Sequence, residues 1–432
     1  MNGSNFQIEQ QCPQCGAPII LDEADRILSC KFCRTRVYLS TEDHFRFYLT
    51  PAEGIPEDIF FVPYWRINGL SYTIEEKDLK VDHQNSLFSY NMTSNIRELD
   101  ISYKYFDVNF LSLNTKLMPH SLGLRPQAMK LKFAGSIENA GKFLQSSPSS
   151  KGNVVSDYQK RTGSINSDIF IGETASVIYT PVYFAKGRIH DAILKKPYEL
   201  RAGGEENEQT YAAAPEEKWH VDFIPLLCPN CGADLPGEKD TLVVFCSNCN
   251  CALLPSNKNF TPVKFLVWQE KRKEIIYLPF WQLKVRVSNI QLETYADLIK
   301  LANLPKVPSE KWKQTPFYFC TPAFKINPSL YLRWCKQITA TPAPMDLVED
   351  FPQNKIYPVT LPVMEALETS PITITGLLAD KRPLMSNAPQ VSFTLEDACL
   401  VLHPFEFKTR ELVHTKLGFA MDINALNLGA YL

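Results

Sequence analysis

Four pairs of cysteines with C-x-x-C spacing constrain the fold of this chain more than any other feature. The pairs are Cys12/Cys15, Cys30/Cys33, Cys228/Cys231 and Cys246/Cys249. In each half of the chain fourteen residues separate the two pairs, so the pattern C-x2-C-x14-C-x2-C occurs twice. This spacing is close to that of four-cysteine zinc sites, in which two tight turns bring four thiolates around one tetrahedral ion. We therefore expect two structural zinc ions, because four thiolates leave no open position for catalysis.

The first pair in each half has the form C-P-x-C-G, which ends at Gly16 and Gly232. Proline presets the turn, and glycine allows the positive φ that turns backbone N–H groups toward the sulfurs. This form resembles the zinc-ribbon class found in RNA polymerase subunits, initiation and elongation factors and many bacterial proteins. The resemblance covers only the two cysteine segments and implies a small metal-stapled β-fold. Iron in similar knuckles, as in rubredoxin, is a minor alternative, since rubredoxin knuckles lie farther apart.

The location that the sequence favours is the cytoplasm. The first twenty residues lack the basic start and apolar core of a signal peptide, and no apolar run approaches the length of a membrane span. Thiols stay reduced in the cytoplasm, so clustered cysteines there bind metal more often than they form disulfides. The cysteines outside the two patterns are expected to be buried free thiols. They are Cys251, Cys320, Cys335 and Cys399.

The two halves of the chain also match each other outside the cysteines. All four cysteine positions recur after 216 residues, which is half of the 432-residue chain. At the same offset, 59–67 (IFFVPYWRI) resembles 275–283 (IIYLPFWQL). At an offset of 223, 177–184 (VIYTPVYF) resembles 400–407 (LVLHPFEF). We interpret the chain as an internal duplication of one unit, a zinc ribbon followed by a larger body.

The two bodies are predicted to be β-rich, with a sandwich-like or barrel-like α+β fold. Apolar and polar residues alternate along 99–105, as in a strand with one solvent-facing side. The best helix candidate is 292–304 (LETYADLIKLANL), which Pro305 ends. The expected units are ribbon 1 at 1–42, body 1 at 43–200 with a flexible insertion at about 145–168, a linker at 201–222, ribbon 2 at 223–256, and body 2 at 257–432.

Linear motifs for catalysis are absent from the sequence. It contains no G-x-S-x-G, no G-x-G-x-x-G and no H-E-x-x-H, and 135–143 (GSIENAGKF) fails as a phosphate-binding loop. His190 and His414 follow the matching Pro-containing segments at similar distances, and we interpret them as structural histidines. These absences favour a non-enzymatic protein, although sites assembled from distant residues leave no linear trace. No catalytic residue is assigned.

Two functions are consistent with this sequence. The favoured one is a zinc-binding tandem-repeat scaffold or adaptor for protein partners, because 45 basic and 47 acidic residues give no overall bias toward nucleic acid. The alternative is a nucleic-acid accessory factor for transcription or replication. Its contact residues would be Lys31, Arg34 and Arg36, beside Phe32 and Tyr38. Ribbon 2 offers only Lys239 against three carboxylates, so it is a poor phosphate binder.

Overall fold

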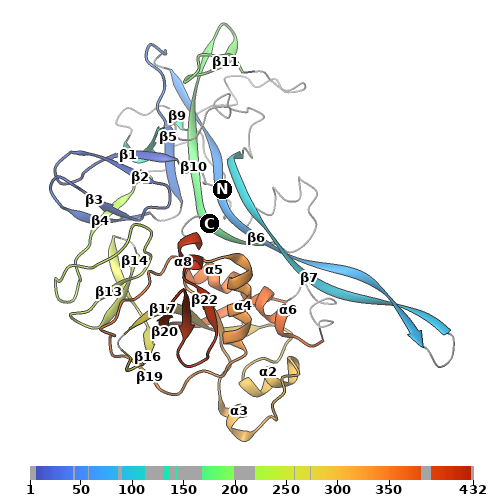
Figure 1. The fold of residues 1–432 in the computed structure, drawn as a ribbon. Helices are drawn as coiled ribbons and strands as arrows, with labels where there is room; N and C mark the ends of the chain where they lie inside the picture. The colour runs from blue at the N-terminus through green and yellow to red at the C-terminus, as the bar shows by residue number, and fades with distance from the viewer. Residues whose placement is uncertain are drawn as a thin grey trace.

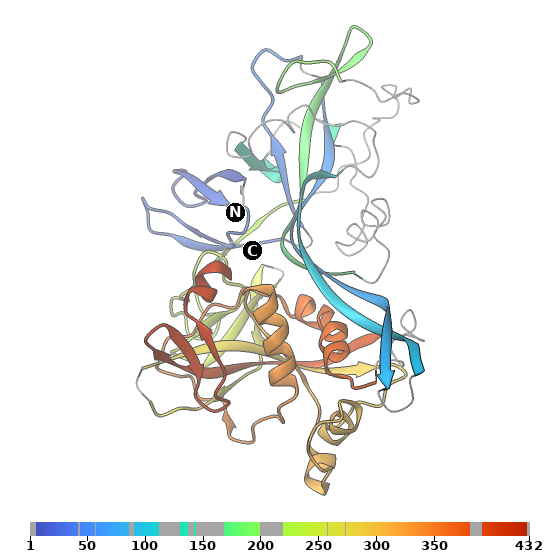
Figure 2. The same ribbon diagram turned by 45° about the vertical axis from the view of Figure 1, so that its right-hand side comes forward.

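The computed structural model describes residues 6–41, 44–56, 58–85, 90–111, 130–136, 142–143, 168–198, 219–256, 258–272, 274–380 and 391–429. Within them the protein is mainly β, as the sequence predicts, and the α-helices lie in the second half (Figures 1 and 2). Residues 145–167 of the expected insertion and residues 201–218 of the expected linker lie outside the described part of the chain. No helix in the described part of the chain is long and apolar enough to cross a membrane.

The first half forms one large sheet and most of a small one. Its elements are β1 (Gln7–Gln11), β2 (Pro18–Asp22), β3 (Ile27–Ser29), β4 (Arg36–Ser40), β5 (Phe45–Leu49), β6 (Ile59–Asn85), β7 (Tyr90–Leu111), β8 (Lys130–Phe133), the 3-10 helix η3 (Ala134–Ser136), β9 (Lys142–Phe143), β10 (Asp168–Ala185) and β11 (Arg188–Asp191). The large sheet has the order β2-β1-β8-β5-β10-β6-β7, with β9 beside β6 and β11 beside β10. Ribbon 1 therefore belongs to this sheet through β1 and β2.

The second half combines a ribbon, a second large sheet and helices that pack on that sheet. Its strands are β12 (Asp222–Pro225), β13 (Val244–Cys246), β14 (Cys251–Ser256), β15 (Asn259–Val263), β16 (Phe265–Trp268), β17 (Ile275–Val287), β18 (Phe319–Pro322), β19 (Leu347–Val348), β20 (Phe393–Lys408), β21 (Glu411–His414) and β22 (Ala420–Asp422). Its helices are α2 (Tyr295–Leu301), α3 (Glu310–Gln314), α4 (Pro328–Thr339), α5 (Val363–Glu368), α6 (Ser370–Leu377) and α8 (Asn424–Gly429). The sheet order is β18-β17-β20-β16-β19, and β21 and β22 extend it from β20.

Three strands pair in the same way in each large sheet. In the first half β10 is antiparallel to β6 and parallel to β5, and in the second half β20 is antiparallel to β17 and parallel to β16. Trp65 lies opposite Val177, and Trp281 lies opposite Leu400. The two tryptophans are 5% and 3% exposed, so each is part of a core. The two large sheets thus share a central arrangement.

The long hairpin of β6 and β7 extends beyond the rest of the molecule (Figure 1), and its base packs on the second half. Tyr72 is fully buried, donates a hydrogen bond to the carbonyl oxygen of Pro328 at 3.3 Å and stacks on Tyr331. The hydroxyls of Tyr103 and Ser329 lie 3.0 Å apart. Helix α4 therefore receives the hairpin of the other half.

The helices are only partly those that the sequence predicts. Helix α2 lies inside the expected range, and Thr294 and Asp297 form a capping box that starts it. Helix α4 is not among our predictions, although Tyr331, Trp334 and Ile338 form a buried face on it. Its helical spacing was the available signal, but its aromatic residues equally suit a strand.

Candidate metal centres

The structure brings the eight predicted cysteines together as two separate clusters. In ribbon 1 the Sγ atoms of Cys12 and Cys33 lie 3.6 Å apart, and those of Cys15 and Cys30 lie 3.7 Å apart. In ribbon 2 the distances are 3.4 Å for Cys228 and Cys249 and 3.5 Å for Cys231 and Cys246. Sulfurs about 2.3 Å from a tetrahedral zinc ion lie about 3.8 Å from one another. Each cluster could therefore hold one metal ion, and its geometry is consistent with zinc.

Each cysteine pair lies on a tight turn whose last residue has a positive φ. Gly16 and Gly232 have φ of 75° and 72°, as the C-P-x-C-G pattern predicts. In the second pair of each ribbon the same place is taken by Arg34 and Asn250, with φ of 63° and 51°. The N–H of Gly16 donates to Cys12 O at 2.9 Å, and the N–H of Arg34 donates to Cys30 O at 3.0 Å. These turns hold the thiols of each pair toward one centre.

The surroundings of the sulfurs favour the thiolate at some cysteines of each cluster, whereas neighbouring thiols and burial raise the pKa of Cys15 and Cys249. Hydrogen bonds from the hydroxyl and the backbone N–H of Thr35 lower the pKa of Cys33 to about 6. Burial raises the pKa of Cys228, but the backbone N–H groups of Cys231 and Asn230 outweigh it and lower that pKa to about 6. A bound zinc ion would use such thiolates to fix the two turns of its ribbon.

The residue two positions after the last ligand differs between the ribbons. In ribbon 1 the Thr35 Oγ1 atom lies 3.2 Å from Cys33 Sγ. In ribbon 2 the Cys251 Sγ atom lies 3.3 Å from Cys249 Sγ. Cys251 is only half-buried, whereas the sequence predicts a buried thiol. Ribbon 2 therefore has a fifth thiol beside its four-cysteine cluster.

The two ribbons pack directly on each other. Strand β12 pairs antiparallel with β4, so that Ile224 lies opposite Tyr38. One apolar cluster contains residues of both ribbons, and its buried members are Ile27, Tyr38, Ile224, Leu226, Cys228, Leu235, Val244, Cys246, Leu253 and Phe260. A shared core makes the stability of one ribbon depend on the other.

Polar contacts reinforce this interface between the ribbons. Arg36 donates to the carbonyl oxygens of Gly237 at 2.8 Å and Leu235 at 3.4 Å. Lys239 forms an ion pair with Asp25 at 3.0 Å, and Asp25 is 6% exposed. Burial raises the pKa of this carboxyl despite the ion pair. Sequence reasoning missed these contacts, because nothing in the local pattern assigns Arg36 a partner about two hundred residues away.

A buried ion pair attaches ribbon 1 to the large sheet of its own half. The Glu23 carboxylate lies 3.4 Å from Nε of Arg66, and both side chains are 1% exposed. Arg66 lies on β6 immediately after Trp65, and its guanidinium also lies over the ring of Phe6. This pair was absent from our sequence predictions.

The basic residues proposed as nucleic-acid contacts do not all have the same environment. Lys31 and Arg34 are exposed at the second knuckle of ribbon 1, and between them Phe32 is 73% exposed. Arg36 instead faces ribbon 2 through the two carbonyl contacts described above. The exposed basic surface of this knuckle therefore comes from Lys31 and Arg34.

The remaining cysteines are isolated thiols within the described residues. Cys335 is fully buried on α4, while Cys320 and Cys399 are half-buried. Burial raises the pKa of Cys320 to about 12 and that of Cys399 to about 11. These thiols therefore remain protonated at neutral pH, which suits a structural role.

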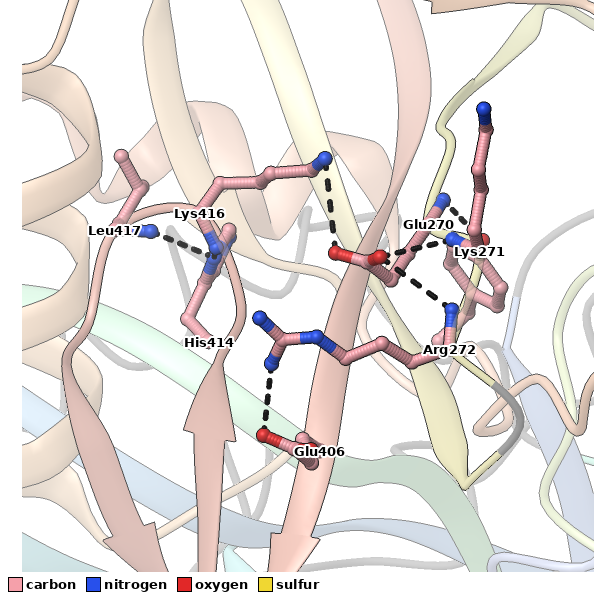
Figure 3. A network of polar contacts seen from close by, with 8 residues as sticks. Glu270, Lys271, Arg272, Glu406, His414, Lys416 and Leu417 are labelled. Atoms are coloured by element: carbon pink, nitrogen blue, oxygen red, sulfur yellow. Dashed lines mark hydrogen bonds and ion pairs between the residues drawn. The ribbon is translucent and has the colours of Figure 1, made fainter.

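His190 and His414 occupy different environments. His190 stacks on Tyr183 and is only partly buried. His414 is fully buried, and its Nδ1 accepts hydrogen bonds from the backbone N–H groups of Lys416 and Leu417, both at 3.2 Å (Figure 3). Its Nε2 must then carry the proton and donate to Nδ1 of His403 at 2.9 Å. The rings of His403 and His414 are therefore neutral parts of the core.

Charged residues near His414 form ion pairs with one another. Lys416 lies 3.6 Å from Glu270, and Arg272 donates to Glu406 at 2.8 Å (Figure 3). The basic run that begins at Lys271 is therefore partly neutralised through Arg272.

Comparison with known proteins gives no relative from which a function could be transferred. No family model matches the chain, and neither a curated protein nor a solved structure matches it. The zinc-ribbon resemblance therefore rests on the cysteine clusters alone.

Proposed function

We propose that the protein is a non-enzymatic zinc-binding scaffold or adaptor that acts on protein partners in the cytoplasm. The observation that carries this proposal is the pair of closed four-cysteine clusters within two ribbons that share one apolar core. Zinc at both positions would hold the two ribbons as a rigid connection between the two large sheets. A four-thiolate site has no free position for substrate, so the metal would support shape and not chemistry.

We further infer that the chain arose by duplication of a ribbon-plus-body unit, with the boundaries given by the sequence. The strand pairing supports this: Pro63 lies opposite Tyr179, and Pro279 lies opposite Leu402. The prolines are separated by the sequence offset of 216, and their partners by the offset of 223. Two independently recognised sequence matches thus meet in equivalent cross-strand pairs.

Zinc analysis of natively purified protein tests the scaffold proposal. We expect two zinc ions per chain, and we expect a strong chelator to release both. Small-angle scattering should then show a larger, more variable distance between the two sheets, because the ribbons lose their fixed turns. One ion or none per chain, or an unchanged scattering profile after zinc removal, would contradict the proposed connecting role.

The exposed knuckle of ribbon 1 supports a second candidate, which is nucleic-acid binding. Phe32 offers a ring for stacking on a base, and Lys31 and Arg34 lie beside it to neutralise phosphates. Binding to labelled single-stranded and double-stranded DNA and RNA should weaken steeply between about 50 mM and 200 mM salt. Lys31→Ala with Arg34→Ala should abolish it. Arg36→Ala belongs in a separate variant, since it disturbs the interface between the ribbons.

A further inference from the structure

A large cleft lies where the ribbons meet both large sheets. Its volume is about 470 Å³, and its lining includes Arg26 and Thr41 from the ribbon 1 side, Asp240 from ribbon 2, and Trp281 and Met364 from the second body. This volume is within the range of about 300–1,000 Å³ that is typical of binding pockets, which often lie between domains. Most of the lining is apolar, so the polar groups in it would decide which ligand fits.

Arg26 is a cationic group of this cleft whose side chain has few hydrogen bonds within the described residues. Its guanidinium lies 4.6 Å above the ring of Phe45, and its backbone N–H is held by Lys239 O at 2.6 Å. Within the described part of the chain the side chain makes a single hydrogen bond, which is long, to Glu23 O at 3.4 Å. A guanidinium has five N–H donors, so most of them are left for a ligand.

A second donor in the cleft also lacks a partner. The hydroxyl oxygen of Thr41 is buried and has no hydrogen-bond partner among the described residues. Buried polar groups without partners are costly, so a ligand oxygen that reaches them would be stabilised. Arg26 and Thr41 both line the cleft, and they lie directly before β3 and directly after β4, two strands that pair with each other.

The other charges in the cleft limit the kind of anion that fits. Asp240, Glu365 and Lys325 line it together with Arg26, so two carboxylates face two cations. A doubly charged phosphate would be repelled by the two carboxylates, whereas a single carboxylate matches the hydrogen-bonding capacity left on one guanidinium. The cleft therefore favours a monoanion attached to an apolar group.

The rim favours a peptide over a small enclosed molecule. Met364 lines the cleft and is 56% exposed, although it is a large apolar side chain. Exposed methionines adapt to varied apolar partners, and they are common at protein-binding surfaces. Apolar residues from several parts of the chain continue this surface into the cleft, and they are Leu242, Leu254, Trp281, Leu361 and Val363.

We propose that this junction cleft binds a peptide segment of a protein partner through one carboxylate on Arg26, with the neighbouring apolar side chains seated against Trp281 and Met364. The inference deepens the scaffold proposal and rests on it, because it names the chemistry of the partner. The carboxylate comes either from the C-terminus of the partner or from an acidic side chain next to apolar residues.

Fluorescence anisotropy with labelled hexapeptides tests the proposal and separates the two sources. The probes are a peptide that ends in two leucines with a free carboxylate, its C-terminal amide, and an amidated peptide with an internal aspartate before two leucines. Binding of the first or third probe without the second supports the proposal and identifies the source. Equal binding of the amide that ends in two leucines, or no binding of any probe, overturns it. Inorganic phosphate should not compete.

Two variants and a matched control connect the binding to this cleft. Arg26→Gln should weaken the carboxylate probes about tenfold or more, as expected for a lost charge-assisted hydrogen bond. Arg34→Gln, an identical change on the exposed knuckle, should have no effect. Met364→Glu adds a negative charge at the exposed rim without touching the core and should also weaken binding. Unchanged zinc content in each variant would show that the scaffold is intact, so a negative result here leaves the proposed zinc role standing.

Discussion

Ribbon 1 and ribbon 2 have the same cysteine spacing and similar turns, but they are attached to the protein in different ways. Ribbon 1 joins the large sheet of its half, since β1 pairs parallel with β8, and the Glu23–Arg66 ion pair fixes it there. Ribbon 2 keeps a separate three-stranded sheet with β15. It reaches the second body through the backbone hydrogen bond from Leu242 to Val359 at 2.8 Å and through Val243, Phe245 and Ala252, which are buried in the core of that body. One motif is thus part of a sheet, whereas its counterpart mainly packs beside one.

From this difference we expect that the contacts around each ribbon decide how far the unfolding caused by loss of its metal ion extends into the rest of the protein. Both ribbons line the junction cleft and share one apolar core. Ribbon 1 is in addition hydrogen-bonded into the large sheet of its half, whereas ribbon 2 packs side chains into the core of the second body. Substitutions in the two ribbons should therefore have unequal consequences, although the motifs look equivalent in sequence.

The largest effect is expected from removal of a metal ligand. Cys30→Ser and Cys246→Ser should each reduce zinc from two ions per chain to one, and structural zinc supplies about 10 kcal/mol or more to such folds. Because the core is shared, Cys30→Ser should also increase hydrogen exchange in β13 and β14 of ribbon 2. Unchanged exchange in these strands would show that the two ribbons are independent.

The next largest effect is expected from the buried ion pair between Glu23 of ribbon 1 and Arg66. Arg66→Met leaves the Glu23 carboxylate buried and unpaired, which should lower the free energy of unfolding by about 3–5 kcal/mol. Arg272→Met, which breaks an exposed pair with Glu406, should cost about 0–1 kcal/mol. Urea unfolding monitored by tryptophan fluorescence measures the change in the free energy of unfolding for both variants. Equal changes would show that the buried ion pair is no more important for stability than the exposed one.

Low pH should destabilise the second body through the buried pair of His403 and His414. Burial lowers the pKa of His403 well below 6.5, and burial together with Lys416 lowers that of His414 to about 3. Between the unfolded value near 6.5 and these lower values the unfolded chain binds more protons. The free energy of unfolding therefore decreases as the pH is lowered through this range, by about 1.4 kcal/mol per pH unit for each histidine.

The free energy of unfolding between about pH 6.5 and pH 4.5 checks this prediction. Loss of zinc at low pH contributes equally to the pH dependence of the unchanged protein and of the His414→Gln variant. Beyond that shared contribution, His414→Gln should reduce the slope of the free energy of unfolding against pH. His190→Gln is the matched control in the first half, and it should leave the slope unchanged. A slope insensitive to His414→Gln would mean that protonation of the cysteine clusters explains all of the pH dependence.

A smaller effect is expected at the interface between the ribbons. Arg36→Ala removes the charge-assisted hydrogen bonds to Gly237 and Leu235, so it should cost about 1.5–3 kcal/mol. Arg34→Ala, two residues earlier on the exposed knuckle, should stay within about 0.5 kcal/mol. Thermal unfolding of the zinc-loaded variants distinguishes these outcomes, and a neutral Arg36→Ala would show that the apolar core alone holds the ribbons together.

The smallest effect on stability, but a clear one on reactivity, is expected from Cys251. Ribbon 2 should release zinc faster than ribbon 1 in hydrogen peroxide, because a fifth thiol contacts the ligand Cys249. Cys251→Thr gives ribbon 2 the residue that ribbon 1 has at this position and should equalise the two rates. A colorimetric zinc indicator follows both releases, and two equal phases in the unchanged protein would contradict the prediction.

The parts of the molecule that sequence could predict are those set by local spacing. The eight cysteines meet as expected, because each knuckle is a short turn whose geometry is fixed by a few residues around it. The β-rich character followed in the same way from the local alternation of apolar and polar residues, as along 99–105. The boundaries of the two repeats remain a prediction.

The parts that could not be predicted depend on contacts between distant segments. Arg36 looks like an exposed cation in sequence, and only the arrival of ribbon 2 turns it toward two carbonyl groups. Glu23 lies in an acidic stretch that suggests solvent, yet Arg66 makes it a buried partner. The junction cleft has no sequence signature, because its lining comes from both ribbons and both large sheets.

The pairing of β12 with β4 also constrains the order in which the chain can fold during synthesis. Strand β4 ends at Ser40, but its partner begins only at Asp222, after the whole first half has been made. The parallel partner of β5 also arrives late, as part of β10. The nascent first half therefore leaves the ribbon with an unpaired edge until the second ribbon emerges. Such late, non-local closure slows folding and makes this edge the place where an incomplete chain would aggregate or meet a chaperone.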